Sequence, residues 1–215
     1  GLVTSALESF HPDDGGLMID IGCNDGIMLK GYPPNRYRLL GIEPSSVGKH
    51  AIEAGFEVEA AFFNEETGAR LRQSHGGAEI ITATNVFAHV DDIRSFAAGI
   101  QALLAGDGVY ISEFPYLGDM LEQCYFDTIY HEHLAYHSVK PLQRFFAAND
   151  MELIEALRVE SHGGSLRGIA QLQGGSRKVG ASVAAAVEEE QRLGLDRAET
   201  LRLFAGHIEA RKQQL

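Results

Sequence analysis

Apolar residues gather in short runs that alternate with amphipathic stretches over most of the chain. Each run is bounded by glycine, proline or acidic residues, a pattern typical of buried strands. Seven strands are expected, at residues 17–21, 37–43, 56–63, 78–85, 109–114, 152–159 and 166–172. The rhythm of strand and helix through the first five predicts an α/β fold with a doubly wound, mostly parallel seven-stranded sheet covered on both faces.

The helical part of the pattern changes along the chain. Helices are expected at residues 2–10, 47–54 and 92–105. Ile27 can begin another one directly after the first strand. From Ser176 onward only helices are expected, and we divide the chain into a domain of residues 1–175 and a C-terminal helical extension of residues 176–215. The last helix has an apolar stripe, which we expect to pack on the domain, on a second copy or on another domain. The stripe consists of Leu201, Phe204, Ala205, Ile208 and Leu215.

Charge and cysteine content exclude several classes of protein. The chain has 18 basic and 30 acidic residues, a net charge of −12, which argues against a nucleic-acid partner or an anionic membrane surface. Its two cysteines cannot build a disulfide framework or a four-cysteine zinc site, so we expect no metal and a reduced, cytoplasmic setting. No apolar run approaches the length of a membrane span. The sequence gives no indication of the oligomeric state.

The first strand runs directly into a glycine turn with the pattern D-x-G-x-x-x-G. A ligand in such a unit lies at the carboxyl end of the strand. A dinucleotide fingerprint would need a glycine at Asn24, and the acidic side chains would repel a pyrophosphate. The acidic loop suits a ligand with a cationic amine and a sulfonium, and its spacing resembles motif I of the class I S-adenosylmethionine (SAM) methyltransferases. The residues expected to bind the cofactor here are Asp20, Gly22, Asn24, Asp25 and Gly26.

Three further positions follow strands and should face the same ligand. Glu43 ends the second strand, where an acid holds the two ribose hydroxyls in both NAD and SAM enzymes. Phe62 and Phe63 point to opposite faces of the third strand, so only one of them can lie beside an adenine, and we assign this to Phe63. Asn85 and His89 follow the fourth strand and should lie on the rim of the pocket.

The densest chemistry lies in Tyr130–His137, where three histidines, two tyrosines and a glutamate fall within eight residues. A metal site could use His133 and His137 with Glu132, but the H-E-x-x-H spacing is absent because Ala135 stands where the second histidine would be. A solvated aromatic loop is a second interpretation. We favour a third, an acid/base cluster, because an imidazole exchanges protons near neutral pH.

Three motifs in the second half of the chain resemble those of sugar C-methyltransferases, which act on nucleotide-linked deoxy-4-keto hexoses. The motifs are EFPYL at residues 113–117, FDTIYHEHLAYHS at 126–138 and SHGGSLR at 161–167. The resemblance implies a class I SAM-methyltransferase (Rossmann-like) domain whose last strand is antiparallel. It also implies SAM as cofactor, S-adenosylhomocysteine as product and a nucleotide-linked sugar as the small-molecule partner.

The same resemblance assigns roles in the reaction. The base that removes the proton α to the keto group would be the second histidine of YHEH, His133. Tyr130 and Glu132 would place the sugar, and His89 would also approach it. A carbon nucleophile, unlike a hydroxyl, must first become an enolate, so it needs a base and donors for the developing oxyanion.

Members of that family usually carry a cysteine-rich zinc module before this domain and another α/β domain after it. Neither lies within the 215 residues, so we expect a core fragment. Three other functions stay open. The chain could be an O- or N-methyltransferase in which His133 deprotonates a heteroatom, an NAD-dependent nucleotide-sugar oxidoreductase or epimerase, or a non-catalytic SAM-binding module.

Overall fold

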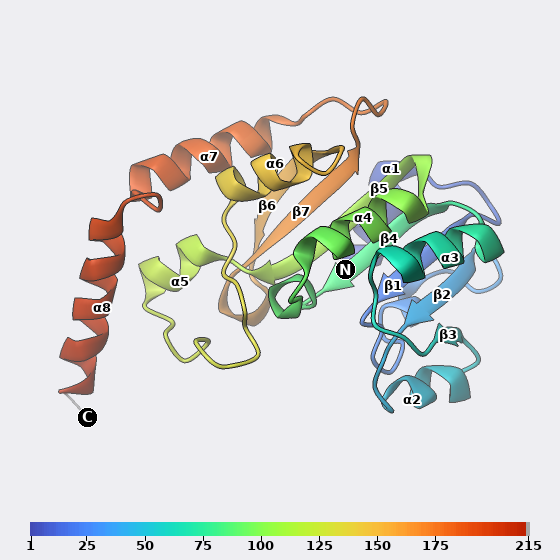
Figure 1. The fold of residues 1–215 in the computed structure, drawn as a ribbon, viewed down its shortest axis with the longest axis horizontal. Helices are drawn as coiled ribbons and strands as arrows, with labels where there is room; N and C mark the ends of the chain where they lie inside the picture. The colour runs from blue at the N-terminus through green and yellow to red at the C-terminus, as the bar shows by residue number, and fades with distance from the viewer. Residues whose placement is uncertain (214–215) are drawn as a thin grey trace.

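A single twisted sheet forms the centre of the molecule (Figure 1). The computed structural model describes residues 1–213. Its seven strands have the order β3-β2-β1-β4-β5-β7-β6, and β7 is antiparallel to both neighbours while the other pairs are parallel. The strands are β1 (Leu17–Ile21), β2 (Arg38–Ile42), β3 (Glu57–Glu59), β4 (Ala78–Thr84), β5 (Leu104–Pro115), β6 (Met151–Val159) and β7 (Ser165–Leu172). The predicted doubly wound sheet and its antiparallel last strand are confirmed.

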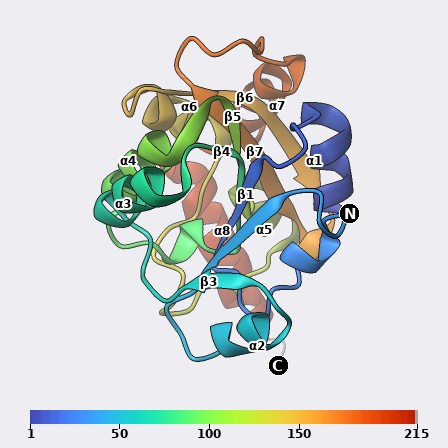
Figure 2. The same ribbon diagram turned by 90° about the vertical axis from the view of Figure 1, so that its right-hand side faces the viewer.

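Helices cover both faces of this sheet. The helices are α1 (Leu2–Phe10), α2 (Gly48–Glu53), α3 (Glu65–His75), α4 (Ile93–Leu103), α5 (Leu117–Gln123), α6 (Val139–Ala147), α7 (Ala181–Leu193) and α8 (Ala198–Lys212). Three short 3₁₀ segments are η1 (Leu29–Gly31), η2 (Phe87–His89) and η3 (Ser161–Gly163). Figure 2 shows α3, α4 and α6 on one side of the sheet and α1 on the other.

Alternate strand residues supply the two halves of the core. On β1, Leu17, Ile19 and Ile21 face the cluster that includes residues of α3, α4, α6 and α7. Met18 faces the opposite cluster, which contains Val3 of α1. A period of two along each strand is what places successive side chains on opposite faces, and burial on both faces explains why the strands read as nearly continuous apolar runs.

The segment after β1 differs from the expectation of a helix. It forms turns and then only the 3₁₀ turn η1, which ends at Tyr32. Pro33 and Pro34 follow at once, and prolines cannot donate the backbone hydrogen bonds that a continuing helix needs. The prediction of a helix beginning at Ile27 was therefore wrong.

The third strand is also shorter than the predicted residues 56–63. Pairing with β2 stops at Glu59, and Ala61 donates its N–H back to the Glu59 carbonyl at 3.0 Å, which turns the chain away from the sheet. The fifth strand, in contrast, begins at Leu104, so that α4 ends two residues earlier than predicted. Strand length at both places is decided by pairing with the neighbouring strand.

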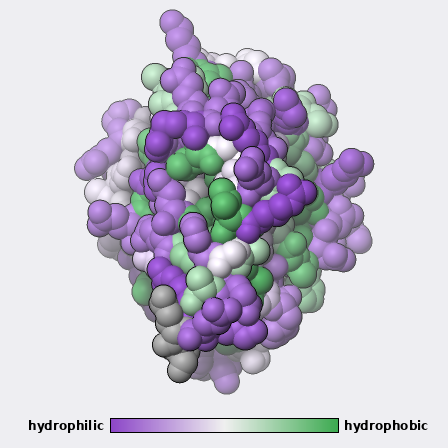
Figure 3. All heavy atoms as spheres, turned by 90° about the vertical axis from the view of Figure 1, so that its left-hand side faces the viewer, coloured by the Kyte–Doolittle hydropathy of each residue, from purple (hydrophilic) through white to green (hydrophobic). Residues whose placement is uncertain are grey.

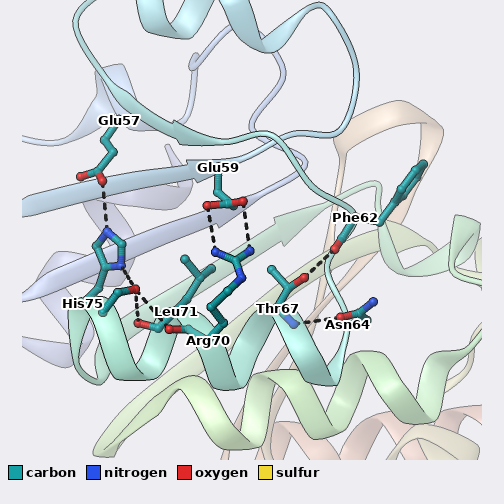
Figure 4. Close-up of polar contacts among 9 residues, drawn as sticks. Glu57, Glu59, Phe62, Asn64, Thr67, Arg70, Leu71 and His75 are labelled. Atoms are coloured by element: carbon teal, nitrogen blue, oxygen red, sulfur yellow. Dashed lines mark hydrogen bonds and ion pairs between the residues drawn. The ribbon is translucent and has the colours of Figure 1, made fainter.

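Helix α3 was not predicted, because its buried stripe is made of Thr67, Gly68 and Leu71 rather than large apolar residues. A Cβ on Gly68 would lie 2.4 Å from the Gly99 carbonyl oxygen, so two glycines bring α3 and α4 into close contact. Polar contacts hold α3 to β3 and to the loop before it (Figure 4). These include the pairs Arg70–Glu59 and His75–Glu57, the Asn64 cap on the Thr67 N–H and the Thr67 hydroxyl bond to the Phe62 carbonyl.

The C-terminal helices occupy one end of the molecule (Figures 1 and 3). Val183 of α7 joins the main core, while α8 packs on α5 through Phe204 and Ile208. Figure 3 shows this end of the molecule, where polar side chains ring a hollow in which apolar ones gather. Part of the predicted stripe thus packs on the domain, whereas Leu201 is half exposed and Leu215 lies outside the described residues. Over residues 1–213, no helix is both long and apolar enough to cross a membrane.

Candidate active site

A cavity of about 550 Å³ opens at the carboxyl ends of β1, β2 and β4. The connections from β1 and β4 leave in opposite directions at this point, as they do at the ligand crevice of other doubly wound sheets. The predicted residues that line the cavity are Gly22, Glu43, Phe63, Asn85 and His89. Lining residues that the sequence interpretation missed include Val90, Asp91, Asp92 and Ser95, which lie between η2 and the first turn of α4.

The glycine turn after β1 is shaped by backbone conformation. Gly22 has φ +70° and donates its N–H to the Ile42 carbonyl at 2.8 Å, and a Cβ there would lie 2.5 Å from Val86. Gly26 has φ +80°. Asn24 has φ +52°, a left-handed conformation that asparagine tolerates better than most residues. The loop therefore keeps a glycine-like backbone at the position where the dinucleotide fingerprint has its second glycine.

Glu43 follows β2 directly and its carboxylate is held in place from two sides. The backbone N–H of Asn24 donates to one carboxylate oxygen at 3.1 Å, and the N–H of Ser45 donates to the other at 2.9 Å. The side chain is buried at the edge of the cavity. A fixed carboxylate with spare lone pairs at this position is suited to accept hydrogen bonds from a diol.

The two predicted aspartates lie outside the cavity lining. Asp20 is buried in the sheet, where its carboxyl oxygen accepts the Thr82 hydroxyl at 2.6 Å. Burial raises the pKa of Asp20 to about 7. Asp25 faces solvent and pairs with Lys30 at 3.6 Å. Asn24 and Gly26 also shape the loop rather than line the cavity.

The cavity lining contains both aromatic rings and carboxylates. Phe63 packs edge-on against Phe96 with 5.2 Å between ring centroids, whereas Phe62 is 79% exposed at the rim. The amide of Asn64 is used to cap α3. Among the described lining residues there are three carboxylates and no lysine or arginine. Such a lining suits a ligand that carries positive charge and disfavours a pyrophosphate.

Two histidines meet beside the cavity. The Nδ1 atom of His89 lies 2.8 Å from the Glu132 carbonyl oxygen, and that of His133 lies 2.8 Å from the Thr128 carbonyl oxygen. Because a carbonyl oxygen only accepts, Nδ1 carries the proton in both rings, and in the neutral rings the lone pair lies on Nε2. The ring centroids are 5.0 Å apart. The loop that carries His133 is held to η2 by the N–H groups of Leu134 and Ala135, which donate to the Ala88 carbonyl.

Tyr130 and Tyr136 complete this cluster, and the Tyr136 hydroxyl donates to the Thr128 carbonyl at 2.9 Å. The Tyr130 hydroxyl lies 3.0 Å from Nε2 of His133. The Glu132 carboxylate faces solvent near His131, whose side chain is 90% exposed. His137 packs against Phe87 and Phe114, and its burial lowers its pKa to about 4. The structure thus brings together His89, Tyr130 and His133, and of Glu132 only the backbone carbonyl takes part.

Among the side chains that the structure describes, no group of three or more histidine, cysteine, aspartate or glutamate residues is placed to hold a metal ion. Arg167, which follows the SHGGS turn, forms an ion pair with the buried Glu113 instead of lining the cavity.

Comparison with known sequences places the chain in a family. The family described as "Methyltransferase domain" matches residues 2–156, and the one described as "C-methyltransferase C-terminal domain" matches residues 160–215. The chain belongs to the SAM-dependent methyltransferases. Among curated relatives of this methyltransferase domain, the C-methyltransferase NovU of Streptomyces niveus is 32% identical over all 215 residues. The chain spans about half (51%) of the length of that relative.

Solved structures agree on the methyltransferase fold. Magnesium protoporphyrin IX methyltransferase (ChlM) from Synechocystis, solved with S-adenosylhomocysteine, has a TM-score of 0.59 at 15% identity, covering 80% of this chain and 81% of that one. The CurJ carbon methyltransferase has a TM-score of 0.56 at 13% identity, covering 80% and 52%. SAM is the cofactor, and the acidic lining of the cavity fits its two cationic groups.

Proposed function

We propose that the protein transfers the methyl group of SAM to the carbon α to the keto group of a nucleotide-linked deoxy sugar. The observation that carries the proposal is the pair of Nε2 lone pairs on His89 and His133 beside the cofactor cavity. An O-methyltransferase can act on an acidic hydroxyl, whereas carbon requires that a C–H proton be removed first. The identity to a C-methyltransferase and the motifs shared with the sugar enzymes support a carbon acceptor.

The cofactor would be held by groups that contacts within the protein already fix. Glu43 would accept the ribose hydroxyls, and Phe63 would lie beside the adenine. Asp91 and Asp92 add negative charge to the lining, which would favour the amino and sulfonium groups. When bound, SAM supplies an electrophilic methyl group on its sulfonium.

His133 is the base in this proposal. Its Nε2 atom takes the proton from the α carbon, while the bond from Nδ1 to the Thr128 carbonyl stabilises the imidazolium that forms. The Tyr130 hydroxyl, 3.0 Å from Nε2, is placed to turn and donate to the developing enolate oxygen. His89 lies between this pair and the cavity and would orient the sugar through its own Nε2.

The two rival histidines are less suited to this role. His131 projects into solvent, away from Nε2 of His133 and from the cavity lining. His137 is enclosed by phenylalanine rings, and its lowered pKa of about 4 makes it a weak base at neutral pH. Geometry and basicity therefore favour His133.

Product analysis tests the carbon acceptor directly. The full-length protein is incubated with SAM that carries a ¹³C methyl group and with a nucleotide-linked deoxy-4-keto hexose. We expect a new methyl resonance in the range of a methyl on carbon, coupled to a ring carbon. A methyl resonance in the O-methyl or N-methyl range would contradict the proposal and support the heteroatom alternative.

A further inference from the structure

A buried carboxylate on α7 joins two segments that are far apart in the sequence. Glu190 is only 3% exposed. It accepts the hydroxyl of Tyr116 at 3.1 Å, the N–H of Lys140 at 3.0 Å and the N–H of Val139 at short range. A buried carboxylate needs several donors to offset the loss of hydration, and here all of them come from outside its own helix.

The partners of Glu190 are the two ends of the segment that carries the proposed base. Tyr116 precedes α5 and Val139 begins α6. His133 lies in the loop between these helices. The ends also touch each other, because Leu117 donates its N–H to the His137 carbonyl at 3.1 Å. The Glu190 carboxylate thus binds residues at both ends of the loop and holds the two ends together.

The two ends use Glu190 in different ways. The N-cap residue of α6, Ser138, makes no side-chain hydrogen bond to the helix, so the first N–H groups of α6 depend on Glu190. A negative charge at this end is also favoured by the helix dipole. At the other end, the Tyr116 ring lies under the Arg158 guanidinium, 5.5 Å from its centroid, and the hydroxyl points to Glu190.

We propose that Glu190 is a positioning residue that holds the loop of residues 124–138 in the arrangement that keeps Nδ1 of His133 on the Thr128 carbonyl and leaves Nε2 as the basic atom. The inference rests on the proposed function of His133. Inside the loop, the ring of His133 forms hydrogen bonds with Thr128 and Tyr130, which are close to it in the sequence. The backbone bonds of Leu134 and Ala135 to Ala88 hold the middle of the loop, and Glu190 holds its two ends. Helix α7 therefore contributes to the reaction although none of its residues lines the cofactor cavity.

Hydrogen–deuterium exchange of the full-length protein tests the clamp. In Glu190→Ala, backbone amides of residues 124–138 should exchange roughly tenfold faster or more, because hydrogen bonds to a charged group are lost. Strands β1 and β4 should keep their protection, and SAM affinity should stay within about twofold. The matched control is Glu189→Ala, next to Glu190 on α7, where only a surface pair with Arg192 is removed.

The ¹⁵N signals of the His133 ring give a second readout. The wild type should show a proton on Nδ1 alone, and Glu190→Ala should show a mixture of tautomers.

Unchanged hydrogen exchange in the loop, or equal acceleration throughout the protein, would overturn the proposed role of Glu190. If Glu190→Ala fails to fold, Tyr116→Phe removes one arm and should give a smaller increase in the same loop, and no increase would overturn the clamp. Localised acceleration supports it even if the wild type removes no α proton, a result that would refute only the proposed function.

Discussion

At the scale of single residues, Glu43 is the clearest link between sequence pattern and site. Two backbone N–H groups fix its carboxylate, and it lines the cavity. These donors also mean that its position does not depend on a bound ligand. In a doubly wound sheet, an acid that ends the second strand is placed to bind the ribose hydroxyls of the ligand. Its position in the sequence pattern was therefore enough to predict that Glu43 lines the site.

Replacing Glu43 by alanine should weaken SAM binding while the fold is kept. A lost hydrogen bond to a charged group is typically worth about 1.5–3 kcal/mol, or roughly tenfold or more in the dissociation constant. Isothermal titration calorimetry with SAM measures the change. Glu53→Ala on the nearby α2, whose side chain only meets His50 on the surface, is the matched control. Equal affinity in Glu43→Ala and the control would argue against the cavity as the cofactor site.

At the scale of elements, the seven strands were predictable because apolar runs and glycine turns mark buried strands. Helices α3 and α6 were missed for different reasons. Helix α3 relies on the contact of Gly68 with Gly99 instead of large apolar residues. Helix α6 does carry an apolar stripe of Val139, Leu142 and Phe146, a signal that the sequence analysis missed. The division into residues 1–175 and 176–215 stays a prediction.

The candidate site was predictable in part for the same reason. Positions that directly follow strands, such as Glu43 and Asn85, line the cavity as expected. Asp20 does not, because its strand carries it into the sheet interior, where it meets Thr82. His89 contacts both the Glu132 carbonyl, 43 residues away in the sequence, and the ring of His133. Only the fold brings these two segments together.

At the scale of the whole molecule, two buried titratable groups give the free energy of unfolding opposite dependences on pH. Burial raises the pKa of Asp20 to about 7 and lowers that of His137 to about 4. At pH values between the pKa of the unfolded state and that of the folded state, Asp20 binds more protons in the folded state than in the unfolded state, and His137 binds fewer. As pH rises from about 4 to about 7, the Asp20 contribution to stability is lost and the His137 contribution is gained.

The Asp20 contribution can be isolated with Asp20→Asn. The asparagine cannot ionise, so the stability of this variant relative to wild type should increase between pH 4.5 and pH 7.5, with most of the change between about 4 and 7. Urea unfolding at a series of pH values measures the difference. The control Asp25→Asn changes a solvent-facing aspartate in the loop that follows β1 and should give a much smaller slope. A wild-type-to-variant difference that does not change with pH would contradict the raised pKa.

The most direct test of the account is loss of the substrate's α deuterium to solvent in full-length His133→Asn. We predict that the wild type exchanges this deuterium and that the variant loses exchange and methylation together by about 10²–10⁴-fold, with SAM affinity nearly unchanged. His131→Asn, in the same loop but exposed, should keep both activities. Exchange that survives in His133→Asn and disappears in His131→Asn or His137→Asn would show that another histidine is the base, and survival in all three variants would contradict the histidine mechanism itself.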